Sequence, residues 1–393
     1  FAYRMKADSE KKLTRNTGFY ERTSKLTRNY VDARGFWLPN DYTKHGIINE
    51  YSACREKAVV IDLSSLRKFE ILGPDAEELM NYTLTRNIKK LSVGQVVYSS
   101  MCYENGTMFD DGTLFKLSDH GFRWICGDEY AGEWLKEQAK KKNYKVLIKN
   151  STDQISNISL QGPNSRKILE KFIFTSPAQP SISELQWFRF SICRIEDLNG
   201  IPLIISRTGY TGELGYEIWC GPSDAPKVWD KVFEAGKDDG LIPAGFGALD
   251  LLRIEAGLIL YGNEFDGQVD PFEAGVGFTV PLKTKTDDFV GKESLKKRKE
   301  NPQKKLVGLE LISKENANHG DCVHIGRAQV GIITSGCISP VLNKNIALCR
   351  IDVGHSKIGT EVEVGKIDGE QKRITAKIVE FPHFDPKKSR VRS

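Results

Sequence analysis

Two stretches of the chain combine residue types that could do chemistry. In the first, Tyr103–Gly112, a turn containing Gly106 leads to the acidic pair Asp110 and Asp111. Adjacent residues of a strand point to opposite faces, so only one of the two carboxylates can enter a given pocket. A carboxylate in an apolar pocket has a raised pKa, which suits a group that shares a proton with a weakly basic nitrogen. The residues alone also allow a simpler alternative, in which both aspartates cap a hairpin.

The second stretch is the glycine-rich segment Arg207–Glu217, which runs into an apolar strand. Its three glycines allow positive φ angles and a close approach of the backbone to a ligand. Tyr210 and Tyr216 offer flat surfaces, and Glu213 and Glu217 offer anionic acceptors, so the segment could hold a flat polar heterocycle. The alternative is an ordinary glycine-rich hairpin turn. Glu217 is unusual in an apolar strand unless a cation or a planar N–H-rich ligand pairs with it.

Two short patterns that would position these residues occur twice and in the same order. A strand ending in a Gly-Pro turn before a helix appears at Phe69–Asp75 and at Ile158–Asn164. A strand ending in Cys-Gly before a helix appears at Trp124–Gly127 and at Ile218–Gly221, and the two offsets are 89 and 94 residues. The similar offsets predict two related α+β halves. If the halves pack about a pseudo-twofold axis, each contributes polar groups to one pocket between them.

The pattern changes after Pro302. Short β-type runs separated by Gly, Asn and Asp turns follow, which is typical of a small barrel or sandwich. The charged segment Lys296–Lys305 is the expected linker. The sequence therefore predicts a first region at 1–300, containing both halves, and a C-terminal β domain at 301–393.

The composition limits the classes of function. The 393-residue chain has a formal net charge of +5 and no apolar run long enough to cross a bilayer. Its basic runs lack zinc-finger spacing or an aromatic nucleic-acid signature, so we expect neither a nucleic-acid nor a membrane partner. The eight cysteines contain no Cys-x-x-Cys pair, which predicts reduced thiols, no metal site and a cytoplasmic location. The sequence also lacks a nucleophile elbow, a Walker loop and a dinucleotide fingerprint, which leaves carboxylates, tyrosines and shaped loops that could position a reactive cofactor.

Several of these motifs together resemble the T-protein family, which comprises aminomethyltransferases of the glycine cleavage system and the folate domains of dimethylglycine and sarcosine dehydrogenases. The most specific stretches are Glu104–Asp111, Ser206–Glu217, Asp270–Glu273 and Thr334–Pro340. The resemblance implies an α+β fold of duplicated ferredoxin-like folate-binding units in a cloverleaf, closed by a C-terminal β-barrel. It also implies tetrahydrofolate as the cofactor.

The resemblance assigns roles to six positions. Asp111 matches the family's catalytic aspartate and would orient the folate and stabilise positive charge as the carbon moves. The positions that match cofactor contacts are Tyr98, Tyr210 and Glu217 on the pterin side, and Leu66 and Phe278 along the folate.

Three departures from the family pattern bear on the substrate. Asp62–Arg67 reads Asp-Leu-Ser-Ser-Leu-Arg where glycine-cleavage members usually have Asp-Val-Ser-His-Met-Gly, Gly127-Asp128 replaces an Asn-Ala pair, and Leu249 replaces an arginine. These changes leave the folate scaffold intact but weaken the case for a lipoyl-bound aminomethyl substrate. The run Met108–Phe115 is closer to demethylase-like branches.

The resulting hypothesis is an enzyme, a tetrahydrofolate-dependent transferase of an aminomethyl or methyl group from a small amine or related donor. One alternative is a non-catalytic folate-binding scaffold or regulator, although such relatives carry a Lys-Gly-Cys-Tyr-type motif that is absent here. Others are the folate subunit of a dimethylglycine or sarcosine oxidase, and a demethylase acting on a compound such as dimethylsulfoniopropionate. A lipoyl carrier protein or a flavoprotein is the expected protein partner.

Overall fold

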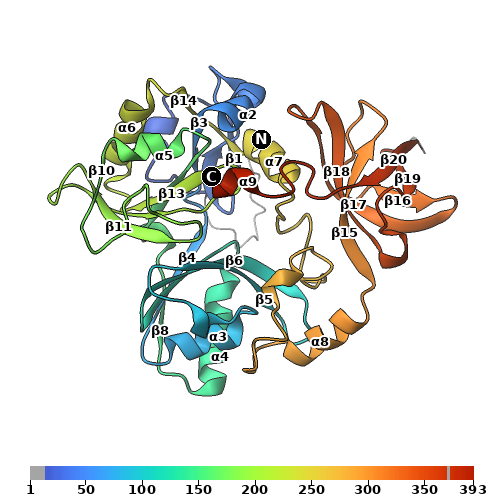
Figure 1. Ribbon diagram of the computed structural model, residues 1–393, viewed down its shortest axis with the longest axis horizontal. Coiled ribbons are helices and arrows are strands. Elements are labelled where there is room, and N and C mark those ends of the chain that lie inside the picture. Colours follow the sequence, from blue (N-terminus) through green and yellow to red (C-terminus); the bar gives the residue numbers. More distant parts are fainter. Residues whose placement is uncertain (1–13, 370–371) are drawn as a thin grey trace, which may run out of the picture.

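The computed structural model describes residues 14–369 and 372–393, which form three lobes around a common centre (Figure 1). Two lobes are sheets covered by helices, and the third is a closed β-barrel. The predicted α+β class with a C-terminal barrel is therefore confirmed. Within the described residues, no helix is both long and apolar enough to cross a bilayer.

The first lobe is a five-stranded antiparallel sheet in the order β5-β6-β7-β4-β8. Its elements are β4 (Arg67–Leu72), α3 (Ala76–Thr83), η1 (Ile88–Lys90), β5 (Val96–Cys102), β6 (Met108–Ser118), β7 (Gly121–Cys126), α4 (Tyr130–Lys142) and β8 (Leu147–Asn150). Without the edge strand β5, this is the βαββαβ order of a ferredoxin-like unit. Alternate residues such as Phe69 and Ile71 of β4 pack against α3 and α4 and leave the other sheet face for the second lobe.

The second lobe repeats this arrangement in a seven-stranded sheet. Its elements are η2 (Thr152–Gln154), β9 (Ser156–Gln161), α5 (Ser165–Glu170), β10 (Ile173–Thr175), β11 (Phe190–Ile195), β12 (Pro202–Ser206), β13 (Gly215–Cys220), α6 (Ala225–Gly236) and β14 (Leu241–Pro243). The strand order is β10-β11-β12-β13-β9-β3-β14. One strand from outside the repeat, β3 (Ala58–Asp62), lies between β9 and β14.

The duplication extends to the strand register. Arg67 pairs with Cys126 in the first lobe, and Ser156 pairs with Cys220 in the second. These pairs are separated by the same offsets of 89 and 94 residues as the sequence patterns. The Gly-Pro turns of the two lobes also share one conformation. Gly73 and Gly162 have φ angles of 134° and 125°, and a Cβ on either would lie 2.5 Å from a backbone oxygen. Only glycine fits this turn, which explains its recurrence.

The two sheets pack face to face through an apolar cluster. Phe115 of β6 lies 5.5 Å from Phe190 of β11 and 5.6 Å from Trp219 of β13, measured between ring centroids. Val96 and Ile125 complete the contact from the first lobe. The interlobe face of each sheet is therefore the one opposite its covering helices α3 to α6.

The N-terminal segment completes the second lobe. It contains α1 (Tyr20–Thr23), the hairpin β1 (Tyr30–Ala33) and β2 (Phe36–Pro39), and α2 (Gly46–Glu56). Helix α2 and α7 (Phe246–Glu255) cover β3 and β14 with a second apolar cluster that includes Val59, Ile61 and Leu249. A short 3-10 turn, η3 (Gly277–Thr279), and α8 (Lys292–Glu300) lead to the barrel.

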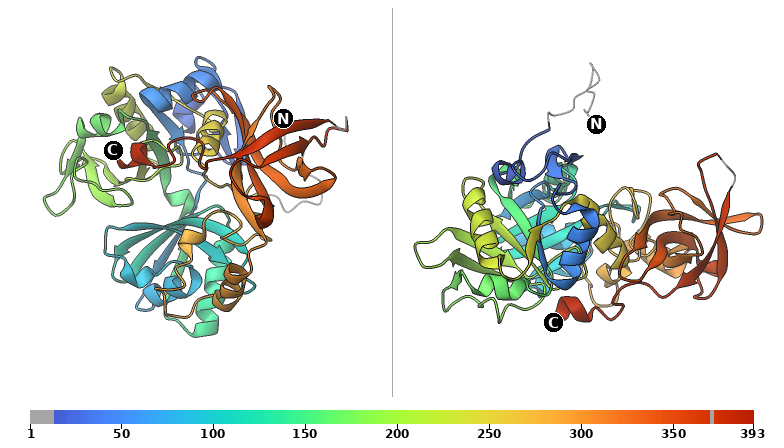
Figure 2. Two further views of the ribbon diagram at one scale, coloured as in Figure 1. Left: turned by 45° about the vertical axis from the view of Figure 1, so that its right-hand side comes forward. Right: turned by 90° about the horizontal axis from the view of Figure 1, so that it is seen from above.

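The barrel closes in the order β15-β18-β17-β16-β19-β20. Its elements are β15 (Lys304–Leu311), β16 (Cys322–Ile325), β17 (Ala328–Ser339), β18 (Lys344–Asp352), η4 (Val353–His355), β19 (Glu361–Gly365) and β20 (Arg373–Val379). The chain then returns to the second lobe, where α9 (Ser389–Arg392) lies beside the 207–217 segment (Figure 2). There Arg207 donates a 2.6 Å hydrogen bond to the backbone oxygen of Ser393.

Candidate active site

The acidic pair of β6 is split between the two faces of the first sheet. Asp111 shares a face with Phe115 and therefore points toward the second lobe. Tyr98 of β5 points the same way, and its hydroxyl donates a 2.7 Å hydrogen bond to Asp111 Oδ2. Burial raises the pKa of Asp111 to about 6, although the hydrogen bond from Tyr98 opposes this rise. The result is an oriented carboxylate that can exchange a proton near neutral pH.

Asp110 serves a different purpose. Its carboxylate accepts hydrogen bonds from the backbone N–H groups of Gly127 at 3.2 Å and Asp128 at 3.1 Å, in the turn before α4. Burial and repulsion from Asp111 raise the pKa of Asp110 to about 7. This carboxylate therefore caps the turn between β7 and α4, rather than a hairpin as the simpler alternative expected of both aspartates, while Asp111 is the one directed to the interlobe face.

The 207–217 segment folds around the side chain of Gln161. A Cβ on Gly209 or Gly215 would lie 2.2 Å or 2.1 Å from the Gln161 amide. Gln161 also donates to the backbone oxygen of Thr208 and accepts from Thr211. Gly209 and Gly215 therefore make room for a side chain of the protein itself, which explains these two glycines without a ligand.

Of the tyrosines and glutamates of this segment, two belong to the interlobe face. Tyr210 donates a 2.5 Å hydrogen bond to the backbone oxygen of Ile259, and Glu217 shares a strand face with Trp219. The expectation that Tyr216 offers a surface to a ligand is wrong, because its ring is fully buried in the core behind the sheet. Strand alternation accounts for this difference between neighbours.

Glu213 is likewise not available as an acceptor for a ligand. Its buried carboxylate is held by Arg55 at 3.0 Å and by Arg390 at 2.8 Å. Glu213 therefore anchors the segment to α2 and to the C-terminal residues.

A row of polar side chains lies between the two apolar clusters of the interlobe face. Glu217 stands opposite Ser159, and Trp219 stands opposite Asn157, in the β13 and β9 pair. The hydroxyl of Thr208 donates to Glu217. Burial raises the pKa of Glu217, while the Thr208 hydrogen bond and the charge of Lys68 lower it.

The buried residues Asn157, Ser65 and Lys68 were not found from the sequence. Asn157 and Ser65 are fully buried, and within the described part of the chain the Asn157 amide and the Ser65 hydroxyl have no hydrogen-bond partner. Lys68 extends from the first lobe to 6.0 Å from the Trp219 ring centroid, and burial lowers its pKa to about 7. The sequence did contain a signal for Lys68. Lys68 and Glu70 alternate with the apolar residues Phe69 and Ile71, so the lysine belongs to the strand face opposite the apolar one.

The remaining predicted cofactor contacts lie at the edges of this region. Leu66 packs against both apolar clusters, and Tyr210 packs in the cluster beneath α7. Phe278 is 62% exposed, and its ring centroid lies 6.1 Å from that of Tyr98. Tyr98, Asp111 and Glu217 therefore lie on the interlobe face, whereas Leu66, Tyr210 and Phe278 border it. Burial raises the pKa of Tyr210, and the charge of Asp111 adds to this rise.

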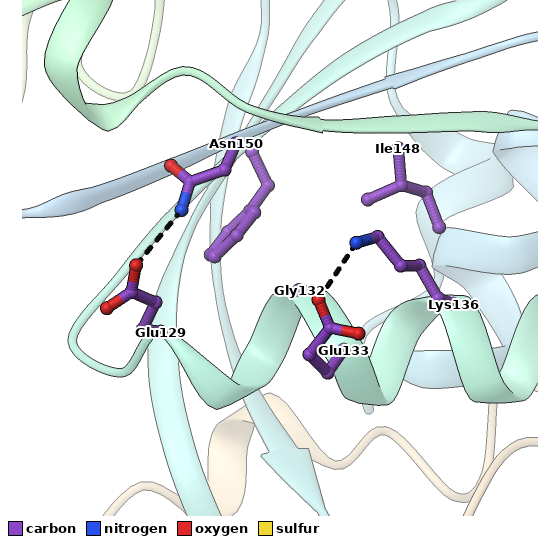
Figure 3. A pocket seen from close by; sticks show the side chains of 7 residues that line it. Glu129, Gly132, Glu133, Lys136, Ile148 and Asn150 are labelled. Atoms are coloured by element: carbon purple, nitrogen blue, oxygen red, sulfur yellow. Dashed lines mark hydrogen bonds and ion pairs between the residues drawn. The ribbon is translucent and has the colours of Figure 1, made fainter. Parts of the chain in front are cut away.

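A surface pocket lies elsewhere, where α4 packs over β4 and β8 (Figure 3). Its polar residues contact one another, as Lys136 pairs with Glu133 at 2.8 Å and Asn150 donates to Glu129 at 3.5 Å. Phe69, which lines it, belongs to the helix-covered face. This pocket is therefore separated from Asp111 by the sheet. No group of three or more metal-ligating side chains is found in the part of the chain that the structure describes.

Two family models match the chain. The GCVT N-terminal domain matches residues 19–284, and the glycine cleavage T-protein C-terminal barrel domain matches residues 304–385. The chain belongs to the glycine cleavage T-protein family. The resemblance inferred from the motifs is thereby confirmed, and so is the prediction of an enzyme of this family.

Two relatives of this T-protein family member show its range. The chain is 57% identical to a trimethylamine-oxide aldolase of Ruegeria pomeroyi over 392 residues, which is 100% of the chain and 50% of that protein. It is 39% identical to an aminomethyltransferase of Symbiobacterium thermophilum over 379 residues, 94% of the chain and 97% of the relative. The chain thus spans half the length of the first relative and nearly all of the second.

A solved structure agrees with the fold. The crystal structure of the glycine cleavage system aminomethyltransferase T from Bartonella henselae matches with a TM-score of 0.83 at 24% identity, covering 94% of this chain and 98% of that one. At this identity the likeness shows the fold of the T-protein family.

Proposed function

We propose that this T-protein family member is a tetrahydrofolate-dependent one-carbon transferase. The observation that carries the proposal is the partly buried hydrogen bond between Tyr98 and Asp111, at a position where the family places its catalytic aspartate. A carboxylate with a pKa of about 6 is mostly ionised at neutral pH yet can accept a proton during a reaction.

The unpartnered polar groups support a folate ligand. Buried polar atoms are nearly always hydrogen-bonded in folded proteins, so the Asn157 amide, which has no partner among the described residues and lies opposite Trp219, could bind a polar group of a ligand at this face. A pterin ring is flat and carries both N–H donors and acceptors along one edge, which fits these atoms and Glu217. Glu217, Tyr210 and Tyr98 would hold the ring, with Leu66 and Phe278 lining the ligand.

The chain's own groups then account for catalysis. Tetrahydrofolate, when bound, supplies the nitrogens that carry the one-carbon unit. Tyr98 occupies Oδ2 of Asp111 and fixes the plane of the carboxylate, so Oδ1 is the oxygen that receives a proton. The ionised carboxylate in a buried setting also stabilises positive charge on a neighbouring nitrogen, which is electrostatic rather than covalent catalysis.

The relatives bear on the one-carbon donor. The 57% identity to a trimethylamine-oxide aldolase exceeds the 39% identity to an aminomethyltransferase. We therefore place the donor among small methylated amine oxides. Their cleavage to an amine and a one-carbon unit at the oxidation level of formaldehyde is redox-neutral, because the N–O bond takes up the two electrons that the methyl carbon loses. The departures at Ser65, Arg67 and Gly127 favour this class over an aminomethyl group on a lipoyl carrier.

The match to only half of the trimethylamine-oxide aldolase favours one further candidate function. This chain could be the folate unit of a larger enzyme, which receives the carbon from another catalytic unit or from a flavoprotein. The 50% coverage of the aldolase supports it. We further propose a division at 1–300 and 301–393, supported by the limits of the two family models, and a cytoplasmic location.

The test is a screen of one-carbon donors with the purified chain and tetrahydrofolate. Formaldehyde, trimethylamine oxide, dimethylglycine, sarcosine, dimethylsulfoniopropionate and the glycine-cleavage components are compared, with products identified by mass spectrometry. We expect the chain to form methylene-tetrahydrofolate from formaldehyde faster than the protein-free reaction does. A chain that binds no tetrahydrofolate by isothermal titration is not a folate enzyme, and methyl-tetrahydrofolate as product would place it in the methyl-transferring branch.

A further inference from the structure

The turn of the β1–β2 hairpin is built to hold one arginine in place. Arg34 and Gly35 both have positive φ angles, 56° and 81°, as a two-residue hairpin turn requires. The turn is closed by a 2.8 Å hydrogen bond from the Gly35 N–H to Asp32. The buried side chain of Arg67 donates a 2.6 Å hydrogen bond to the backbone oxygen of Arg34. The backbone from which the Arg34 side chain extends is therefore fixed to β4.

The Arg34 side chain reaches the acidic pair over Gly127. Arg34 Nη2 and Asp110 Oδ1 lie 3.2 Å and 3.3 Å from the point that a Cβ of residue 127 would occupy. Burial raises the pKa of Asp111, and the charge of the Arg34 guanidinium opposes this rise. A side chain at position 127 would require the guanidinium or the Asp110 carboxylate to shift by a few tenths of an ångström, so glycine leaves room for the approach of Arg34.

The guanidinium keeps its hydrogen-bonding capacity. Arg34 is an exposed residue, and among residues 14–369 and 372–393 its side chain makes no hydrogen bond or ion pair. By contrast, the guanidiniums of Arg67 and Arg55 are buried and donate to several protein oxygens. Within the described residues, the guanidinium of Arg34 therefore keeps its N–H donors available, next to Gly127 and the acidic pair.

The duplication shows that this arrangement is particular to one half. Gly221 is the counterpart of Gly127, and a Cβ there would meet its nearest atom, in Asp224, at an ordinary 3.6 Å. The counterpart of Arg67 is Ser156. The second lobe therefore has neither the arginine that holds the hairpin nor the close approach over the glycine.

We propose that Arg34 is a specificity-determining residue that binds a negatively polarised oxygen of the one-carbon donor beside Asp111. The inference rests on the proposed function and deepens it. A guanidinium offers a fork of N–H donors to a carbonyl, carboxylate or amine-oxide oxygen and repels an ammonium group. The site would thus prefer donors that carry such an oxygen over simple cationic amines.

The experiment measures binding to the ligand-free chain. ¹³C-formate serves as the carboxylate probe, trimethylamine oxide as the amine-oxide probe and methylammonium as the cationic probe, each titrated by NMR. Arg34→Gln should weaken formate and amine-oxide binding by on the order of 10-fold or more, as expected for a lost hydrogen bond to a charged group. Arg34→Lys should retain part of the affinity, because it keeps the charge and loses the fork.

Two glycine variants provide a matched pair. Gly127→Ala should weaken formate binding without removing any charge, whereas Gly221→Ala should bind as the unmodified chain does. Arg327→Gln, which changes an exposed arginine of the barrel, controls for net charge. Thermal unfolding of each variant shows that the fold is retained.

The outcomes separate this inference from the proposed function. The proposed role of Arg34 is overturned if Arg34→Gln binds formate as tightly as the unmodified chain does. It is also overturned if methylammonium binds as tightly as formate. Titration of the same proteins with tetrahydrofolate tests the proposed function independently. Arg34-dependent formate binding without any folate binding would uphold this site and reject the folate enzyme.

Discussion

The hydroxyl of Tyr98 and the carboxylate of Asp111 are joined by a 2.7 Å hydrogen bond between the neighbouring strands β5 and β6. Both side chains extend from the sheet face that packs on the second lobe. The bond leaves one carboxylate oxygen for a reacting group and holds it in a fixed direction. The candidate catalytic group is thus oriented by the first lobe and faces residues of the second.

Replacing Asp111 tests its chemical role. Asp111→Asn keeps the shape of the side chain but cannot accept a proton, so kcat should fall by about 100-fold or more. Tetrahydrofolate affinity should change little, because the predicted pterin contacts are on other residues. Asp119→Asn, an exposed aspartate beyond the same strand, is the control. Unchanged turnover in Asp111→Asn removes this residue from the mechanism.

The pH dependence follows from the raised pKa of Asp111. Activity should be lost as the pH falls through about 6, because protonation removes the base. The groups that act on this carboxyl include the hydroxyl of Tyr98 and the charges of Arg34, Glu264 and Asp110.

Tyr98→Phe is the variant that checks this assignment. The hydrogen bond from Tyr98 favours the ionised form, so its loss should move the acid limb of the kcat/KM profile to higher pH. Tyr144→Phe, a tyrosine on the helix side of the sheet, should leave the profile in place. A limb that stays fixed in Tyr98→Phe would assign the titration to another group.

Glu217 should contribute to binding rather than to turnover. Glu217→Gln removes a buried anionic acceptor, and tetrahydrofolate should bind about 10- to 100-fold more weakly, as for other lost charged hydrogen bonds. Isothermal titration measures this change. The control is Glu234→Gln, which changes an exposed glutamate. A folate affinity that is unaltered in Glu217→Gln would exclude a direct contact.

Arg55 should matter for stability. Its buried guanidinium pairs with Glu213 at 3.0 Å and with Glu255 at 2.6 Å. Arg55→Met leaves both carboxylates without this partner, and the free energy of unfolding should fall by about 3–5 kcal/mol. Arg22→Met removes a solvent-screened pair with Asp230 and should lower the free energy of unfolding far less. Urea unfolding compares the two, and equal losses would contradict the assignment.

Much of the architecture could be predicted because its signals are local. A strand, a Gly-Pro turn and a helix form a pattern that neighbouring residues impose, and its repetition at Gly73 and Gly162 indicated the duplication. Strand alternation likewise separated Asp110 from Asp111. The same rule, applied to Tyr216 and Glu217, would have shown that only one of them faces the other lobe.

By itself, the sequence determined the α+β class, the duplicated halves, the C-terminal β domain and the strands that carry Asp111 and Glu217. Only the tertiary structure decided which side chains meet. Strand β3 enters the second sheet from outside the repeat, Lys68 crosses between lobes, and Arg34 reaches Asp110 over Gly127. These contacts join residues far apart in the chain, and they depend on how the sheets pack rather than on the pattern of any one segment.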